Sequence, residues 1–365
     1  MLKPTYQLPS LPPPGDLETP EVLRQAARAH RYLAEVKGKA FSIPNQAILI
    51  DTLSLQEAKA SSEIENIVTT QDELFQLSLF ANSDSATPAA KEVAHYRDAL
   101  KRGFDLLRQN KGLLTNNAII EMFRVLKGTT DEFRRTPGTA LRNELTGDLV
   151  YVPPQDHNEI VRHMTALERF INDDQASALD PLVKMALIHH QFESIHPFTD
   201  GNGRIGRIIN VLYLTRVGLL DIPVLYLSRY ITAHKADYYR LLQHVRDDGS
   251  WEPWLLYVLR AVAETSQRTL ELIEGMRDLM ADYKRRLRAH ASVRYSQDLL
   301  NNLFRHPYTR IEFMQTDLKI TRQTAAKYLD QLADAGLVEK HQKGRNNYYI
   351  NAPLVSLLMR VSQSA

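Results

Sequence analysis

Hydrophobic residues recur at intervals of three and four along most of this chain, which is the spacing of helices with one buried face. The stretch TPEVLRQAARAHRYLAEVKGKA starts with Thr19 as an N-cap and Pro20 at the first helical position. The same spacing predicts helices in NQAILIDTLSLQEAKASSEIENI, AAKEVAHYRDALKRGFDLLRQN, NAIIEMFRVLKG and DHNEIVRHMTALERFINDD. Strand patterns are few, so the chain is predicted to be mainly α.

One segment, RNELTGDLVYVPPQ at 142–155, has the pattern of a small β-hairpin. Thr146, Gly147 and Asp148 are turn residues, and the β-prone run that follows ends at two prolines. An exposed hairpin edge can bind the backbone of another chain. We therefore expect the edge formed by Val150, Tyr151 and Val152 to hold a protein segment.

The two ends of the chain differ from its helical middle. The proline cluster Pro9–Pro14 favours extended backbone, either as an arm on the protein surface or as a flexible leader. The stretch Pro253–His290 reads as one long helix or two, and it connects to a separate C-terminal unit. A chain of 365 residues is long enough for two or three domains.

The C-terminal unit, 296–365, reads as helix, helix, turn, helix and a two-stranded wing around Lys343 and Gly344. Thr321 caps the last helix and Gly336 ends it, so the unit resembles a winged helix-turn-helix domain. It holds nine basic and six acidic residues, a net charge of +3. The residues that could contact DNA are Arg322, Gln323, Thr324 and Lys327 on the helix and Lys343 and Arg345 on the wing. The alternative use of such a domain is dimerisation or protein docking.

Composition limits the function classes. The chain has 45 basic and 43 acidic residues, so any nucleic-acid footprint must be local. It has no cysteine, which excludes disulfides, thiolate metal sites and a cysteine nucleophile. The N-terminus lacks the apolar core of a signal peptide, and no later run is long enough to span a membrane. These features together predict a cytoplasmic protein.

Candidate catalytic and ligand-binding residues are most concentrated in HPFTDGNGRIGR, 196–207. Its Gly201-x-Gly203-x-x-Gly206 spacing is that of a dinucleotide-binding turn, which requires a strand leading into the first glycine. The preceding PLVKMALIHHQFESI has helical spacing and an Asp180-Pro181 helix start. The missing strand argues against a Rossmann fold.

The alternative is a phosphate-binding turn between two helices. Its glycines let backbone N–H groups point inward at a helix N-terminus, where the dipole favours an anion. Side chains can supply the other parts of a phosphoryl or nucleotidyl transfer site: an amide at Asn202, guanidinium groups at Arg204 and Arg207, a Mg²⁺ ligand at Asp200 and a base at His196.

The order His196-Pro-Phe198-x-Asp200-Gly-Asn-Gly-Arg204-x-x-Arg207 matches the HPFx(D/E)GNGRxxR motif in full, so the chain resembles the Fic family. Most members transfer AMP from ATP to a hydroxyl side chain of a protein. The resemblance implies a Fic-type helical core with the hairpin as its target-binding flap. The implied division is 1–94 for the arm and an N-terminal helical region, 95–260 for the catalytic core, 261–295 for a connecting helix and 296–365 for the winged helix.

The resemblance also implies roles for individual residues. His196 would be the general base, Phe198 would anchor the loop and Asp200 would bind Mg²⁺. The expected nucleotide-binding residues are Gly201, Asn202, Gly203, Arg204, Ile205, Gly206 and Arg207, with Tyr238 and Tyr239 lining an adenine pocket. The two tyrosines could instead pack in the core. His189, His190 and Glu193 could be metal ligands, but packing near the site is the favoured interpretation.

A second motif, SSEIEN, matches the family's inhibitory signature (S/T)xxxE(G/N) at Ser61, Glu65 and Asn66. Ser61 and Glu65 are four residues apart and share one helix face. A glutamate bound to Arg207 would withdraw that arginine from the γ-phosphate of ATP. The alternative is an ordinary solvated glutamate on a helix surface.

The sequence therefore predicts an autoinhibited adenylyltransferase that uses ATP and Mg²⁺ to modify a Ser, Thr or Tyr hydroxyl of a target protein and of itself. One alternative is a DNA-binding regulator whose Fic domain senses a nucleotide. Another is removal of AMP from a modified target, with Glu65 orienting water. A homodimer and DNA binding through the winged helix are further expectations.

Overall fold

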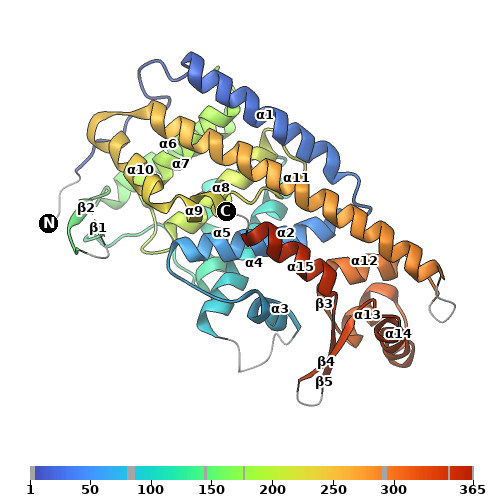
Figure 1. Cartoon of the computed structure of the whole chain (residues 1–365). Coiled ribbons are helices and arrows are strands. Elements are labelled where there is room, and N and C mark those ends of the chain that lie inside the picture. The colour runs from blue at the N-terminus through green and yellow to red at the C-terminus, as the bar shows by residue number, and fades with distance from the viewer. Residues whose placement is uncertain are drawn as a thin grey trace.

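The protein is mainly helical, as the hydrophobic spacing predicts (Figure 1). The computed structural model describes residues 5–79, 87–143, 146–175, 177–289, 294–343 and 346–363. The helices before the C-terminal region are α1 (Pro20–Ala40), α2 (Gln46–Ile64), α3 (Gln71–Leu79), α4 (Pro88–Gln109), α5 (Asn116–Lys127), α6 (His157–Asn172), α7 (Pro181–Ile195), α8 (Asn202–Arg216), α9 (Ser228–Ala233), α10 (Lys235–Asp248) and α11 (Trp251–Ala289). Those that follow are α12 (Gln297–Arg305), α13 (Ile311–Leu318), α14 (Arg322–Asp334) and α15 (Ala352–Gln363).

Two small antiparallel sheets complete the described structure. The strands are β1 (Leu141–Arg142), β2 (Leu149–Tyr151), β3 (Tyr308–Thr309), β4 (Glu339–Lys343) and β5 (Asn346–Ile350). The first sheet is the predicted hairpin, in which Leu141 lies opposite Tyr151. The second has the order β3-β5-β4. The fold is therefore mainly α with a small β-hairpin, as expected.

Local sequence signals set the helix starts. The Thr19 hydroxyl accepts a hydrogen bond from the amide of Val22 at 3.3 Å, and Pro20 is the first residue of α1. Asp180 caps α7 in the same way, accepting from the amide of Leu182 at 2.8 Å. Both groups satisfy amides that have no partner within the helix. The segment before the glycine-rich loop is thus a helix, as its spacing predicts.

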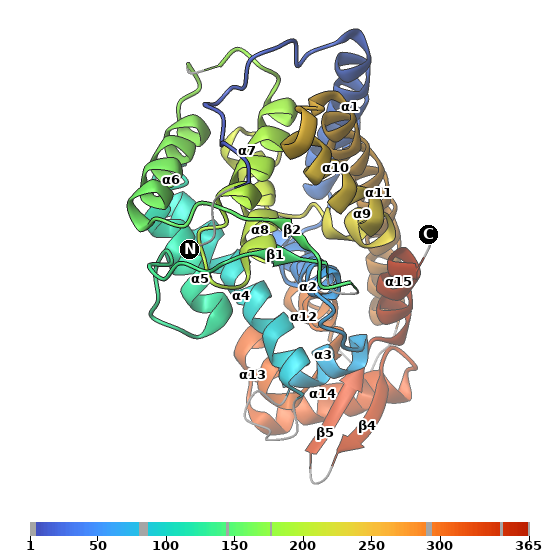
Figure 2. The ribbon, with the colours of Figure 1, turned by 90° about the vertical axis from the view of Figure 1, so that its left-hand side faces the viewer.

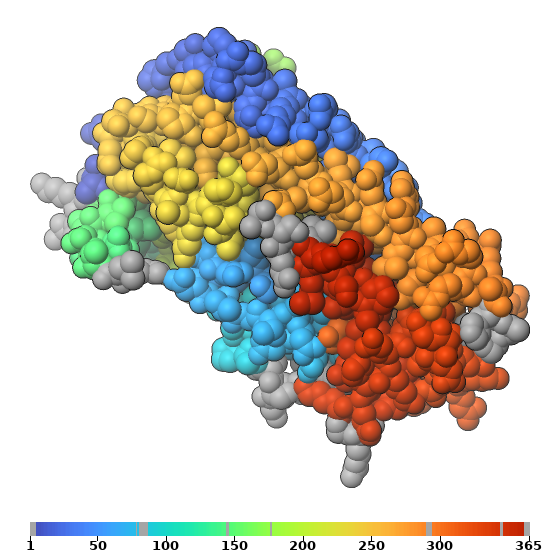
Figure 3. All heavy atoms as spheres, viewed as in Figure 1, coloured from blue at the N-terminus to red at the C-terminus, as the bar shows by residue number. Residues whose placement is uncertain are grey.

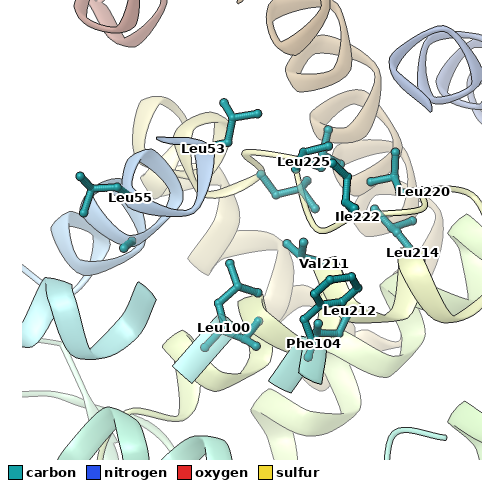
Figure 4. Packing of buried hydrophobic residues seen from close by; sticks show 14 of the residues in the cluster. Leu53, Leu55, Leu100, Phe104, Val211, Leu212, Leu214, Leu220, Ile222 and Leu225 are labelled. Atoms are coloured by element: carbon teal, nitrogen blue, oxygen red, sulfur yellow. The ribbon is translucent and has the colours of Figure 1, made fainter. Parts of the chain in front are cut away.

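The central helices α7 and α8 are buried almost all round. Figure 4 shows how α8 contributes Val211 and Leu212 to a cluster that also contains Leu53 of α2 and Leu100 of α4. Burial of such side chains is the main favourable contribution to folding, at roughly 25 cal/mol per Å² of apolar area. The loop that joins α7 to α8 is consequently held at both ends by the core.

The long C-terminal helix pattern forms one continuous helix, α11, of 39 residues. It packs along α1 and extends from the central helices to the C-terminal region (Figures 1 and 3). There the expected helices and wing hairpin are present as α12, α13, α14, β4 and β5. Strand β3 and helix α15 are additions that the sequence pattern did not indicate, and α15 packs back on α11.

The arm of residues 5–14 lies against the protein. The amide of Thr5 donates to the carbonyl of Val152 at 3.2 Å, and the Gln191 side chain donates to the carbonyl of Pro9 at 3.1 Å. The sequence left two alternatives open, an arm on the protein surface and a flexible leader. The structure shows the surface arm. Among the described helices, none combines the length and apolar character that crossing a membrane requires.

Candidate active site

The loop between α7 and α8 starts at His196, which has left-handed backbone (φ 51°) and ends α7. Its imidazole is partly buried, and its Nδ1 atom has no hydrogen-bond partner. Burial, together with the nearby Arg134 and Arg246, lowers the pKa of His196 to about 4. The imidazole is therefore neutral at pH 7 and able to accept a proton.

The backbone of this loop is braced from inside and from outside. The Asn202 amide donates to the carbonyl of Phe198 and its carbonyl accepts from the amide of Phe198, both at 2.8 Å. The Arg134 guanidinium donates to the carbonyl of His196 at 2.9 Å. The ring of Phe198 stacks on that of Phe123 with centroids 4.0 Å apart. The side chain of Asn202, expected to face a phosphate, is thus occupied in holding the loop.

A turn able to bind an anion follows at the start of α8. Gly201 adopts left-handed backbone with φ 78°, which glycine does without strain. The amides of Asn202, Gly203 and Arg204 are the first of α8 and have no carbonyl partner within the helix. These amides and the helix dipole favour an anion at this end.

The two arginines of the motif are buried and have different partners. Arg204 is 2% exposed and pairs with Glu92 of α4, while its Nη2 lies 3.7 Å from Asp200. Arg207 is 1% exposed and pairs with Glu65. The sequence spacing predicts that both face one polyphosphate. In this structure Arg204 is paired with a carboxylate of α4, and Arg207 is paired with the carboxylate of Glu65, which follows α2.

Arg207 donates three hydrogen bonds to the predicted inhibitory motif. Its Nε donates to the hydroxyl of Ser61 at 2.8 Å. Its Nη2 donates to the carbonyl of Ser61 at 2.9 Å and to Oε1 of Glu65 at 2.8 Å. A Cβ atom at Gly203 would lie only 2.5 Å from the same Glu65 oxygen, so glycine is needed for this close approach. Glu65 and Arg207, 142 residues apart in the sequence, are thus in direct contact.

The last residue of the inhibitory motif has a conformational role. Asn66 has φ 60°, in the left-handed region that glycine and asparagine enter most readily. The chain turns there directly after Glu65, the C-cap residue of α2. This explains in physical terms why the position suits Gly or Asn.

A buried carboxylate, Glu57, fixes α2 to its neighbours and was not foreseen from the sequence. It accepts hydrogen bonds from the amide of Ser228 at 3.0 Å, from the Ser228 hydroxyl, and from the Tyr96 hydroxyl at 3.2 Å. Burial raises the pKa of Glu57 despite these bonds and the charge of Arg207. Its sequence neighbourhood, LQEAK, is that of any surface helix, so no local pattern distinguishes it.

Asp200 lies at the mouth of the turn, with its side chain 65% exposed. Lys127 donates to its carboxylate at 2.7 Å. Burial of part of the group would raise the pKa of Asp200, but Lys127 and Arg204 outweigh it and the pKa is lowered. Mg²⁺ in phosphate-transfer sites is commonly held by one or two carboxylates together with substrate phosphates. One ionised and exposed carboxylate beside an anion-binding turn fits this donor set.

The two tyrosines after the loop are placed differently. Tyr238 is 2% exposed, packs against Trp254 with ring centroids 5.9 Å apart, and shares a 2.8 Å hydrogen bond with His189. Tyr239 is 47% exposed. Of the pair expected to line an adenine pocket, Tyr239 is accessible to solvent, whereas Tyr238 lies in the core.

The histidines of α7 are buried in the same polar cluster. Burial lowers the pKa of His189 to about 3 and that of His190 well below its ordinary value. His189 also contacts the Asn210 side chain at 3.0 Å, and His190 bonds to the carbonyl of Leu242 at 3.2 Å. These contacts match the packing role favoured from the sequence.

The hairpin is partly an internal element. Tyr151 is fully buried, donates to the carbonyl of Ser194 at 2.6 Å, and has the Arg246 guanidinium 4.1 Å from its ring centre. Val152 is 1% exposed and pairs with Thr5 of the arm. Val150, 41% exposed, remains accessible. The accessible edge is therefore narrower than the expected Val150–Val152, because Tyr151 and Val152 anchor the hairpin.

Three parts of the chain match models of known protein families. Residues 113–214 match the family described as Fic/DOC family, and residues 23–105 match Fic/DOC family N-terminal. Residues 279–354 match the C-terminal domain described as Protein adenylyltransferase SoFic-like.

Curated relatives have modest similarity over about half of the chain. Protein adenylyltransferase Fic of Aedes aegypti is 30% identical over 181 residues, covering 48% of this chain and 32% of the relative. Protein adenylyltransferase fic-1 of Caenorhabditis elegans is 28% identical over 178 residues, covering 47% and 32%. The chain thus spans about a third of the length of these relatives.

Solved structures share the fold. A Fic family protein from Desulfovibrio desulfuricans G20 superposes with a TM-score of 0.57 at 18% identity, over 96% of this chain and 98% of that one. Fic-1 of C. elegans superposes with a TM-score of 0.54 at 21% identity, over 70% and 75%. With the complete motif on its loop and the matches to three parts of its sequence, the chain belongs to the Fic/DOC family.

Proposed function

We propose that this protein transfers AMP from ATP to a hydroxyl side chain of a target protein, and to itself, and that Glu65 inhibits the transfer. The observation that carries the proposal is the loop 196–207, where a neutral histidine stands beside a helix N-terminus and two buried arginines. The two curated relatives described above are both named protein adenylyltransferase, which supports the same activity.

In the proposed reaction, the target hydroxyl oxygen attacks the α-phosphorus of ATP while His196 takes the hydroxyl proton. The new oxygen–phosphorus bond replaces the bond to pyrophosphate, which leaves with the electron pair of that bond. The amides at the start of α8 and the freed Arg207 would stabilise the phosphate charge. The bracing of the loop by Asn202 and Arg134 keeps His196 in place, which lowers the entropic cost of the attack.

Asp200 is the residue that would hold Mg²⁺, and a bound Mg²⁺ would supply positive charge at the phosphates. In the present arrangement the Lys127 ammonium occupies this carboxylate at 2.7 Å. Lys127 would therefore have to move aside or share Asp200 when the nucleotide binds.

Inhibition follows from the partners of Arg207. A charge-assisted pair in a partly buried site is worth about 1.5–3 kcal/mol. Each 1.4 kcal/mol is about tenfold in an equilibrium, so repression of roughly ten- to a hundredfold is expected. ATP can still enter, but without Arg207 on the γ-phosphate its α-phosphorus would not be aligned for attack.

The decisive experiment measures incorporation of labelled AMP by three variants. Glu65→Gly should raise self-modification, because it frees Arg207. Glu65→Gly with His196→Ala should lose roughly 10²–10⁴ of that rate, since general-base assistance has this size. Glu65→Gly with Arg207→Ala should also stay low, because it lacks the phosphate clamp. A folded Glu65→Gly protein that binds ATP and transfers no more AMP than wild type would sink the proposal.

The remaining expectations stay predictions. They are a cytoplasmic location, a homodimer, and DNA binding by the C-terminal region. The wing residue Lys343 donates to Gln76 of α3 at 2.6 Å, and Arg322 pairs with Glu312 at 2.8 Å. Two of the expected DNA contacts thus have protein partners in this structure, and Arg345 lies outside the described residues.

A further inference from the structure

The C-terminal domain, defined here as residues 294–363, contacts the helices on both sides of the inhibitory Glu65. Asp51 of α2 accepts a hydrogen bond from Nε of Arg305, at the end of α12, at 2.6 Å, and another from Lys101 of α4. Burial alone would raise the pKa of Asp51, but the two cations outweigh it and the pKa is lowered. An ionised carboxylate on the inhibitory helix is thus shared between the C-terminal domain and the Fic core.

The second set of contacts involves α3, which follows the inhibitory motif. The Tyr308 hydroxyl of β3 donates to Asp72 at 2.6 Å, and the Tyr308 ring lies 5.1 Å from that of Phe75. Lys343 of β4 donates to Gln76 at 2.6 Å. Figure 2 shows α3 between α4 and the strands of the C-terminal domain. Three side chains of one short helix are therefore tied to this domain.

These contacts matter because α3 has only nine residues. Isolated helices of this length are unstable in water and depend on tertiary packing. Close packing does not fill the whole seam, since a cavity of about 510 Å³ lies between α2, α3, α4 and the C-terminal domain. Specific polar contacts and the Tyr308–Phe75 contact therefore carry much of the attachment of α3 to this domain.

The path of the chain links this seam to the active site. Glu65 follows the last residue of α2, and only the short connection 65–70 separates α2 from α3. Glu57 already ties the middle of α2 to the Fic core. The position of the Glu65 carboxylate thus depends on both the end of α2 and the place where α3 is held.

We propose that the C-terminal domain is the clamp that keeps the inhibitory segment on Arg207, with Arg305 and Tyr308 as its positioning residues. Displacing the domain would loosen α3 and the connection 65–70, and Glu65 would leave Arg207 more often. The inference rests on the proposed function, because it concerns regulation of that same site.

The test uses the full-length double variant Arg305→Ala/Tyr308→Phe, which removes the Arg305–Asp51 and Tyr308–Asp72 hydrogen bonds, keeps the aromatic ring on Phe75 and leaves the Lys343–Gln76 contact in place. The matched control is Lys340→Ala, which removes an ion pair with Asp330 at 2.7 Å inside the C-terminal domain. Hydrogen exchange of the amides 60–70 should become faster in the double variant and stay unchanged in the control. Unchanged exchange in the double variant would overturn the clamp, whatever the activity.

AMP incorporation supplies the second readout. The double variant should self-modify roughly two- to tenfold faster than wild type, as expected from losing a few partly exposed polar contacts. In a Glu65→Gly background it should add nothing, because the carboxylate it releases is absent. An equal increase in both backgrounds would show a general structural effect and contradict the clamp.

Two further results distinguish failure of the clamp from failure of the proposed function and from misfolding. If Glu65→Gly itself fails to transfer AMP, the proposed function fails, whereas the exchange experiment still decides the clamp. If the double variant melts well below the control, Tyr308→Phe alone replaces it, because this change deletes a single hydroxyl. Wild-type exchange and wild-type transfer in folded Tyr308→Phe and Arg305→Ala single variants would both count against the proposal.

Discussion

Arg207 donates three hydrogen bonds to Ser61 and Glu65, so these donor groups are not available to another partner. Its charge also bears on the buried groups around it. Glu193 of α7 is 8% exposed, its Oε1 atom has no hydrogen-bond partner, and it lies within the electrostatic reach of Arg207, Glu65 and Arg246. Burial, only partly offset by Arg207, raises the pKa of Glu193 from 4.5 to about 7.

This shift predicts a dependence of stability on pH. The folded protein retains the Glu193 proton up to about pH 7, whereas the unfolded chain loses it near 4.5. The contribution of protonated Glu193 to the free energy of unfolding is therefore fully present below pH 4.5 and is lost as the pH rises through 7. Between pH 5 and 8 the free energy of unfolding of wild type should fall by roughly 1–3 kcal/mol more than that of Glu193→Gln. Urea denaturation at both pH values checks this, with exposed Glu35→Gln as the control that should follow wild type.

At the scale of elements, the proposed inhibition depends on the geometry at the end of α2 as well as on the Glu65 carboxylate that follows it. Glu57 holds the helix in register through Ser228 and Tyr96, so that Ser61 and Glu65 both reach Arg207. The left-handed turn at Asn66 then takes the chain away from the site. A change in that turn should therefore weaken inhibition with the carboxylate still present.

Replacing Asn66 with valine tests the turn. A β-branched residue in left-handed backbone costs about 1–2 kcal/mol. If this strain destabilises the state in which Glu65 binds Arg207, AMP transfer should rise by up to about tenfold. Asn66→Gly is the matched control and should stay inhibited, because glycine accepts this backbone freely. Equal self-modification by the two variants would show that the turn does not govern docking.

The hairpin provides a second test at this scale. Its accessible part is Leu149–Val150, since Tyr151 and Val152 are buried. If a target segment adds to this edge, its contacts are largely main-chain. A proline at Val150 should then reduce target modification more than ATP binding, because it removes a donor and restricts the backbone. Parallel measurement of AMP transfer to the target and of nucleotide affinity distinguishes this from misfolding, in which both would fall together.

At the scale of the whole molecule, the C-terminal domain both packs on the Fic core and carries the residues expected to bind DNA. Lys343 contacts α3 at 2.6 Å, so use of the wing by a ligand would compete with the contact to the helix after Glu65. If the protein is a DNA-binding regulator, binding of DNA to the wing would therefore weaken the proposed clamp.

DNA binding itself can be measured directly. Association of the intact protein with duplex DNA should weaken with salt, and the variant Arg322→Ala/Lys327→Ala/Lys343→Ala should bind more weakly. Each lost phosphate contact lowers the steepness of the salt dependence by about 0.9. The total change should therefore approach about 3. Absence of any salt-sensitive association in wild type would remove the DNA-binding expectation.

The helices and the main motifs of the candidate site could be predicted from the sequence alone, because the signals for them are local. Apolar spacing and capping residues such as Thr19 and Asp180 set the helices, since they act within one or two turns. The dense motif 196–207 and the pair Ser61–Glu65 likewise concentrate their chemistry in a few neighbouring residues.

Only the tertiary structure decided which of these groups are accessible and what holds them. Burial of Tyr151 and Tyr238, the use of Asn202 as a brace, and the pairing of Arg204 with Glu92 all depend on residues distant in sequence. The carboxylates Glu57 and Glu193 are ordinary helix residues until the fold removes water from them. Desolvation and long-range pairing are properties of the packed molecule, so no local pattern could reveal the link from Arg305 and Tyr308 to the segment that carries Glu65.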